Sequence, residues 1–179
     1  MPGELIRLAL EQGLSASFVG YAMVMLLVER KMRRTGGPGI IPFELAGHSA
    51  AAEAIMARWG VEGRRAARLS LVLDFGYMLN YGFLIGLLLD RTARRNRHRR
   101  AVPVLVVAAV VSDAVEGISL LRVLDHRNVE QNASRAKNAA LTKFALLGTC
   151  AGYLAKFGIV RTWTRRREAK RPNPRGTVA

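Results

Sequence analysis

Apolar residues fall into four long runs, separated by clusters of charged residues. Each run carries at most two charged side chains and is close to the ~20 residues that a helix needs to cross a hydrocarbon core of about 30 Å. We therefore expect four membrane spans, over residues 8–28, 69–89, 101–121 and 139–160. The predicted fold is all-α: a polytopic membrane helical bundle of four transmembrane helices plus one interfacial amphipathic helix.

A soluble four-helix bundle is the alternative, but its helices would need a polar face. Residues 104–112 contain only apolar side chains and one serine, which leaves no such face. A cleavable signal peptide is also disfavoured, because the first run passes directly into the charged segment 29–34 with no small-residue cleavage site. The first run is therefore expected to be a retained span.

The interfacial helix is expected over residues 43–59. The turn cluster 35–39 ends the preceding helix, Ser49 suits a helix N-cap, and Trp59 would lie at headgroup depth. A rival topology lets residues 39–57 cross as a fifth span. That span would carry charged side chains into lipid at ~2.5–3.5 kcal/mol for each central charge, so we favour four spans.

Composition agrees with a membrane protein that has basic ends. Half of the 179 residues are apolar, yet 28 Lys and Arg face 13 Asp and Glu, for a formal net charge of +15. So much apolar sequence excludes a disordered chain, and a single cysteine, Cys150, excludes a disulfide scaffold or a Cys-based zinc site. We expect no cofactor, no metal and no nucleic acid, since the six arginines of residues 91–100 suit anionic lipid headgroups.

The basic segments also predict the orientation. Residues 91–100 and the start of the tail, 165–171, collect Lys and Arg, as cytoplasmic segments do. Both termini are then cytoplasmic, with a four-span domain over 1–164 in the cell membrane and a basic, disordered tail over 165–179. One feature opposes this orientation, because residues 30–68 would face outward although they carry eight basic side chains.

Charged residues inside spans are costly, so each requires an explanation. At 1.5 Å per residue, Lys143 lies ~6 Å, Asp74 ~8 Å, Glu116 ~12 Å and Asp113 ~16 Å from the outer surface. These similar depths predict one polar cavity that opens outward beneath the interfacial helix. Three acids beside one base cannot all ionise cheaply, so at least one carboxyl should hold a proton.

Helical spacing adds further residues to the cavity wall. Asp74, Tyr77 and Tyr81 share one face at i, i+3 and i+7, and Asn80 lies on its flank. We expect Asp74, Asp113 and Glu116 to be catalytic, and a substrate to contact these side chains: Tyr77, Asn80, Tyr81, Lys143, Glu44 and Trp59.

The chemistry that such a cavity suits is acid-driven isomerisation or cyclisation of a lipid-like or isoprenoid-like small molecule, since a protonated carboxyl beside aromatic rings can protonate an alkene. Two alternatives stay open. Lys143 can pair with the acids to specify helix packing, in a non-catalytic membrane subunit or assembly factor. A proton-coupled carrier is the other. The expected partners are membrane lipids, a hydrophobic substrate, and a second copy of the chain or another membrane protein.

Two pairs of glycines have the small-xxx-small spacing that lets helices approach closely: Gly82 with Gly86, and Gly148 with Gly152. All four fall in the inner halves of their spans. They predict tight packing at the inner end and a splayed outer end.

Four short motifs together resemble a group of small bacterial four-span integral membrane proteins of unassigned function: Phe43-Glu-Leu-Ala-Gly47, Trp59-Gly60, Leu73-Asp74 and Asp113-x-x-Glu116. The resemblance covers most of the chain outside the C-terminal tail. It implies no activity, but it indicates that the four patches belong to one arrangement.

Overall fold

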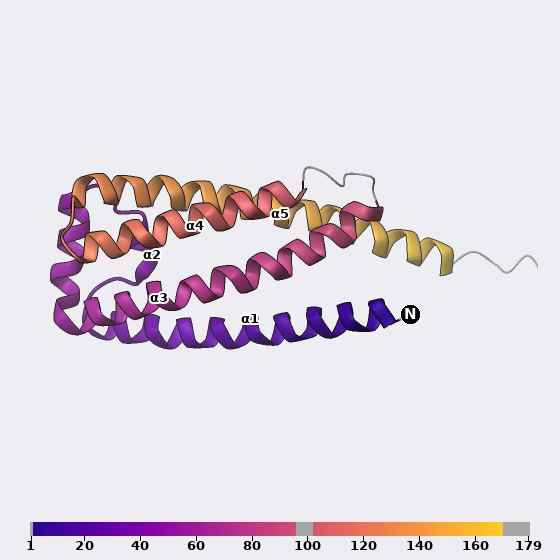
Figure 1. Cartoon of the computed structure of the whole chain (residues 1–179), viewed down its shortest axis with the longest axis horizontal. Helices are drawn as coiled ribbons and strands as arrows, with labels where there is room; N and C mark the ends of the chain where they lie inside the picture. Colours follow the sequence, from indigo (N-terminus) through magenta and orange to yellow (C-terminus); the bar gives the residue numbers. More distant parts are fainter. Residues whose placement is uncertain (1, 96–101, 170–179) are drawn as a thin grey trace, which may run out of the picture.

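The computed structural model describes residues 2–95 and 102–169 and forms five helices and no strand within them. The helices are α1 (Pro2–Arg34), α2 (Ile40–Glu44), α3 (Ser49–Arg95), α4 (Val102–Leu124) and α5 (Val129–Ala169). The four long helices lie side by side and alternate in direction, with α3 packed on α1, α4 on α3, and α5 on both α3 and α4 (Figure 1). We call the end where α1 begins and α5 finishes the termini end, and the opposite end the turn end.

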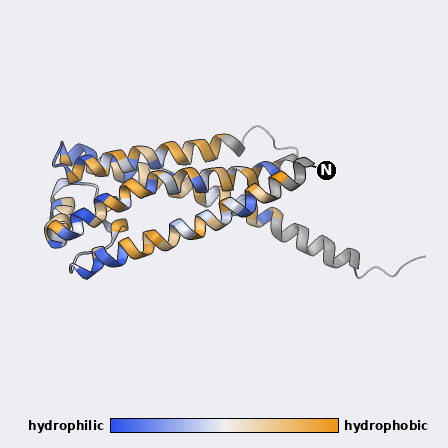
Figure 2. Cartoon of the chain, turned by 60° about the horizontal axis from the view of Figure 1, so that its bottom comes forward, coloured by the Kyte–Doolittle hydropathy of each residue, from blue (hydrophilic) through white to orange (hydrophobic). Residues whose placement is uncertain are grey.

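Three of the helices contain segments long and apolar enough to cross a membrane. They are Ala9–Arg34, Ser49–Ala93 and Val104–Leu124, and they contain nearly all of the first three expected spans. The fourth expected span, 139–160, lies within α5, which is not among the three. Apolar side chains such as Val19, Phe83 and Val107 remain exposed on the bundle (Figure 2). The chain thus has the features of a multi-pass membrane protein.

The segment expected to form one interfacial helix over 43–59 is divided in two. Phe43 and Glu44 end α2, residues 45–48 are not helical, and the remainder is the beginning of α3. Gly47 explains the break, because its φ of +76° is a left-handed conformation that favours glycine. No separate helix over 39–57 forms, so the structure lacks the element that a fifth span would need.

α3 is one helix in two arms joined at Gly60. The φ of +58° and ψ of −158° at this residue are not helical, and they are accessible mainly to glycine. The first arm lies across the turn end of the bundle, and the second runs along it (Figure 1). His48, rather than the expected Ser49, caps the first arm, because its Nδ1 accepts the N–H of Ala51 at 3.2 Å.

The main apolar core closes the turn end. Trp59 is 1% exposed, its ring centroid lies 4.9 Å from that of Phe43, and its Nε1 donates to the carbonyl of Pro38 at 2.6 Å. Backbone fits closely around this ring, since a Cβ at Gly37 would lie 2.2 Å from Trp59 Cδ1 and one at Gly63 would lie 2.5 Å from its Cβ. Trp59 therefore packs as a core side chain and not as the headgroup-level anchor expected from the sequence.

The core at the termini end is smaller. Its buried side chains are Leu89, Ala93, Val106 and Cys150. The prediction that the glycine pairs pack tightly here is wrong for most of them, since a Cβ added at Gly86, Gly148 or Gly152 meets no described atom within 4 Å. Gly82 alone fits it, with Val110 Cγ2 2.7 Å from its added Cβ.

Candidate functional site

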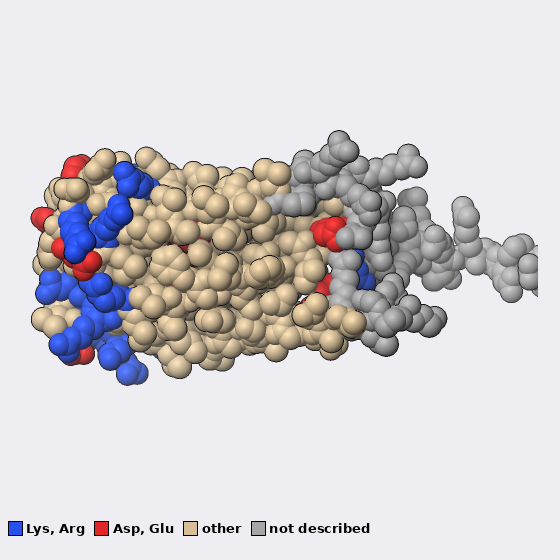
Figure 3. Space-filling model, in the orientation of Figure 1, with Lys and Arg blue, Asp and Glu red and all other residues tan. Residues whose placement is uncertain are grey.

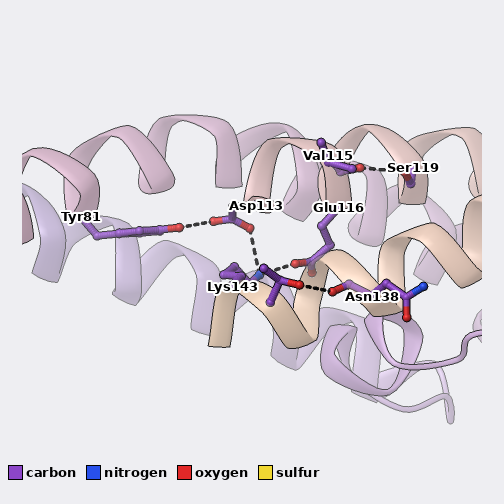
Figure 4. Close-up of polar contacts among 8 residues, drawn as sticks. Tyr81, Asp113, Val115, Glu116, Ser119, Asn138 and Lys143 are labelled. Carbon is purple, nitrogen blue, oxygen red and sulfur yellow. Dashed lines mark hydrogen bonds and ion pairs between the residues drawn. The ribbon is translucent and has the colours of Figure 1, made fainter. Parts of the chain in front are cut away.

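Charged side chains from α4 and α5 meet inside the bundle, between the two apolar cores. Lys143 Nζ lies 2.9 Å from Asp113 Oδ1 and 2.7 Å from Glu116 Oε2, and all three residues are buried (Figure 4). From α3, the hydroxyl of Tyr81 donates to Asp113 Oδ2 at 2.5 Å. We call these four residues, with Glu44, the carboxyl–lysine cluster.

The i, i+3 spacing of Asp113 and Glu116 explains the double pairing. Both carboxyls leave α4 on the face toward α5, so one ammonium bridges them. Such pairs inside a protein need close geometry to offset the loss of hydration. Here each carboxylate has the ammonium within 3 Å, and Asp113 also accepts the tyrosine hydroxyl.

Glu44 brings a fourth element, α2, to the cluster. It is 9% exposed, its carboxyl lies within hydrogen-bonding reach of Glu116, and it interacts electrostatically with Lys143. Burial raises the pKa of Glu44, the nearby charge of Asp113 adds to this shift, and Lys143 opposes it. Glu44 is therefore the carboxyl in this group that is best placed to keep a proton.

Asp74 lies beside the cluster and is only partly buried. It interacts electrostatically with Asp113, Lys143 and Glu44, although no described cation lies within ion-pair distance of it. The expectation that acids from separate helices meet at one level is thus met by Asp113, Glu116 and Lys143, with Asp74 at the margin.

Aromatic rings connect this margin to α1. Tyr77 lies 5.8 Å from Tyr81 between ring centroids, and it stacks on Phe18 of α1 at 5.1 Å and contacts Tyr21 at 6.2 Å. The sequence analysis missed Phe18 and Tyr21. Their i, i+3 spacing on an otherwise aliphatic span was the available signal.

Two expected substrate contacts differ from the rest. Trp59 is enclosed in the turn-end core with Phe43 and Pro38 as its partners. Asn80 is 8% exposed, and its Oδ1 lacks a hydrogen-bond partner among the described residues. Asn80 is therefore a buried polar atom with unused capacity, whereas Trp59 has none left to offer a ligand.

Within residues 2–95 and 102–169 no three His, Cys, Asp or Glu side chains are arranged to hold a metal ion. The carboxyls of the cluster are instead held by Lys143. The arrangement can store a proton, hold a polar group, and fix α2, α3, α4 and α5 together. No family model, curated protein or solved structure matches the chain.

Proposed function

We propose that this chain is an integral membrane protein whose carboxyl–lysine cluster binds the polar end of a lipid-like small molecule and exchanges a proton with it. The observation that carries the proposal is a single ammonium, that of Lys143, shared among buried carboxyl groups from α2 and α4, with Asp74 nearby. Charge balance in such a site favours at least one neutral carboxyl, and Glu44 is the candidate. A neutral carboxyl inside a membrane protein is a proton donor.

The side on which a ligand would bind is the one lined by Asp74 and Tyr77. Both residues are partly exposed, while Asp113, Glu116 and Lys143 are buried. α1 packs chiefly against α3, so the aromatic row of Phe18, Tyr77 and Tyr81 borders a side of the bundle that α1 alone covers. An apolar chain would lie along these rings with its polar end at Asp74. Acid-driven isomerisation or cyclisation is the reaction we propose for such a ligand.

The proposal includes four membrane spans. α5 packs along α4, so a bilayer that contains α4 also surrounds residues 139–160 of α5. Lys143 lowers the hydropathy of this segment, but its charge is paired inside the bundle and does not face lipid. Both termini would then lie on one side, which we propose to be the cytoplasm. A reporter fused to the turn end tests this, and cytoplasmic activity of that reporter contradicts it.

The test compares Asp74→Asn with wild type, since Asp74 is outside the ion pairs that hold the helices. The protein is purified from membranes, and co-purifying small molecules are identified and quantified by mass spectrometry. Asp74→Asn should lower the bound molecule several-fold without changing the unfolding temperature by more than about 2 °C. Glu53→Gln, an exposed carboxyl on the first arm of α3, is the matched control.

The competing function is that of a membrane subunit or assembly factor, in which the cluster only specifies packing. The two ion pairs of Lys143 favour it, because they join α4 to α5 directly. If Asp74→Asn keeps a full complement of bound molecule, or if wild type carries none, the binding proposal fails and the packing role remains.

A further inference from the structure

A basic pocket lies at the turn end, away from the carboxyl–lysine cluster. Its volume is about 190 Å³, and it is lined by Val61, Arg64, Arg65 and Arg68 of α3 with Leu124 of α4. The kink at Gly60 begins this stretch, and Arg64 Nε donates to the Gly60 carbonyl at 3.2 Å. Figure 3 shows the basic side chains gathered at this end beside an uncharged band.

The carboxylates near the pocket leave part of its positive charge free. Arg68 pairs with Asp125, and Arg65 lies 3.5 Å from Glu62. Arg127 also acts on Asp125, so four guanidinium groups face two carboxylates. Guanidinium groups bind phosphate oxygens in paired hydrogen bonds, so a phosphate is the ligand that this surplus favours.

The same face of α3 becomes apolar directly beyond the arginines. Arg65, Arg68, Val72, Leu79 and Phe83 follow one another at helical spacing, and the last three are 55%, 51% and 66% exposed. The neighbouring face of α4 is also apolar and exposed, through these residues: Ile118, Val115, Val111 and Val107. A basic group at the bilayer surface is thus continuous with a surface suited to lipid chains.

An apolar groove of about 390 Å³ lies farther along the two helices, lined by Leu79, Phe83, Gly86, Val107 and Val111 among others. Gly86 is open to it, since an added Cβ would meet no described atom within 4 Å. The eleven residues from Arg68 to Leu79 span ~16 Å along the helix, which is about the depth of one leaflet. A lipid held at the arginines would therefore reach this groove with the end of its acyl chain.

We infer that the α3–α4 face is a binding site for an anionic phospholipid, with the headgroup phosphate in the pocket of Arg64, Arg65 and Arg68 and one acyl chain running toward the groove at Gly86. The site uses no residue of the carboxyl–lysine cluster. It therefore stands or falls independently of the function proposed above.

The test titrates phosphatidylglycerol and phosphatidylcholine against the full chain in detergent and measures bound lipid by native mass spectrometry. Wild type should prefer phosphatidylglycerol. The double variant Arg64→Gln and Arg65→Gln should weaken its binding about 30-fold, from ~1 kcal/mol for each basic residue. The matched control removes the same charge from two exposed residues at the same end, Arg34→Gln with Arg58→Gln, and should change binding less than about 3-fold.

A second variant tests the acyl chain. Gly86→Leu fills the groove, so it should weaken binding of long-chain phosphatidylglycerol about 5-fold and leave a short-chain analogue unchanged. Equal losses in the two arginine pairs, or no preference for the anionic lipid, would overturn the site. Displacement of the lipid by millimolar inorganic phosphate would assign the pocket to free phosphate instead.

Discussion

The two ends of the bundle are built from similar apolar helices but differ in how they are closed. At the turn end, α2 and the first arm of α3 cover the long helices, and Phe43, Trp59 and Met56 fill the space between them. At the termini end the buried set of described residues is small and comes from α3, α4 and α5. The helices are thus locked together at the turn end and pack more loosely at the other.

The carboxyl–lysine cluster lies between these two regions. Its polar contacts replace apolar packing at the level where the turn-end core stops, through Glu44 of α2 and the pairs of Lys143. This position indicates that the cluster contributes to helix association as well as to any ligand chemistry. Removing its one cation is therefore the strongest perturbation that we can make to the comparison.

Lys143→Met should destabilise the protein by about 3–5 kcal/mol, because it leaves Asp113 and Glu116 buried without their counter-charge. The expected readout is a large fall in the unfolding temperature in detergent and loss of protein from the membrane. Lys156→Met is the matched control, since Lys156 is an exposed lysine on the same helix and should change stability by less than about 0.5 kcal/mol.

Restoring charge balance should recover most of this loss. Combining Lys143→Met with Asp113→Asn and Glu116→Gln removes both buried charges, and replacing a buried ion network as a whole is much cheaper than removing one partner. If Lys143→Met alone unfolds like wild type, the ion pairs do not hold α4 to α5.

A pair of glycine variants tests the packing difference directly. Gly63→Ala should cost about 1–3 kcal/mol, because its Cβ would lie 2.5 Å from Trp59 Cβ and 2.9 Å from Thr35 Oγ1. Gly148→Ala meets no described atom within 4 Å and should stabilise α5 by about 0.5–1 kcal/mol. Both lie inside helices, so the difference between their unfolding free energies isolates packing. Equal effects would show that the two ends are packed alike.

The helices and the cluster could be predicted because charge inside an apolar run is conspicuous. Asp113, Glu116 and Lys143 stood out in spans where such residues are costly, and their depths along the helices predicted the meeting that the ion pairs show. The place of Glu44 was harder to foresee, since nothing local to it indicates that α2 folds back against α4.

Helix boundaries and packing density were less predictable. Hydropathy marks where a helix enters lipid, not where it begins, so α3 extends well before residue 69. The break before α3 depends on one left-handed residue, Gly47, and the bend on Gly60. Glycine spacing shows where backbones are able to approach, but only contact with neighbouring helices decides whether they do, as Gly82 and Gly148 illustrate.

The smallest effect we expect is an acid-dependent loosening of the turn end. Glu130 at the start of α5 accepts the backbone N–H of Ser49 at 2.7 Å, and this bond lowers the pKa of Glu130 below its ordinary 4.5, with a further contribution from His48. A lowered carboxyl pKa stabilises the fold at any pH above the unfolded value, and that stability is lost as the pH falls through the folded value. The unfolding temperature of wild type should therefore decline between about pH 5 and pH 3 more steeply than that of Glu130→Gln, which cannot titrate. Glu53→Gln, an exposed carboxyl on the first arm of α3, should decline like wild type. Parallel curves for all three proteins would mean that the bond between Glu130 and Ser49 does not help to hold the first arm of α3 against α5.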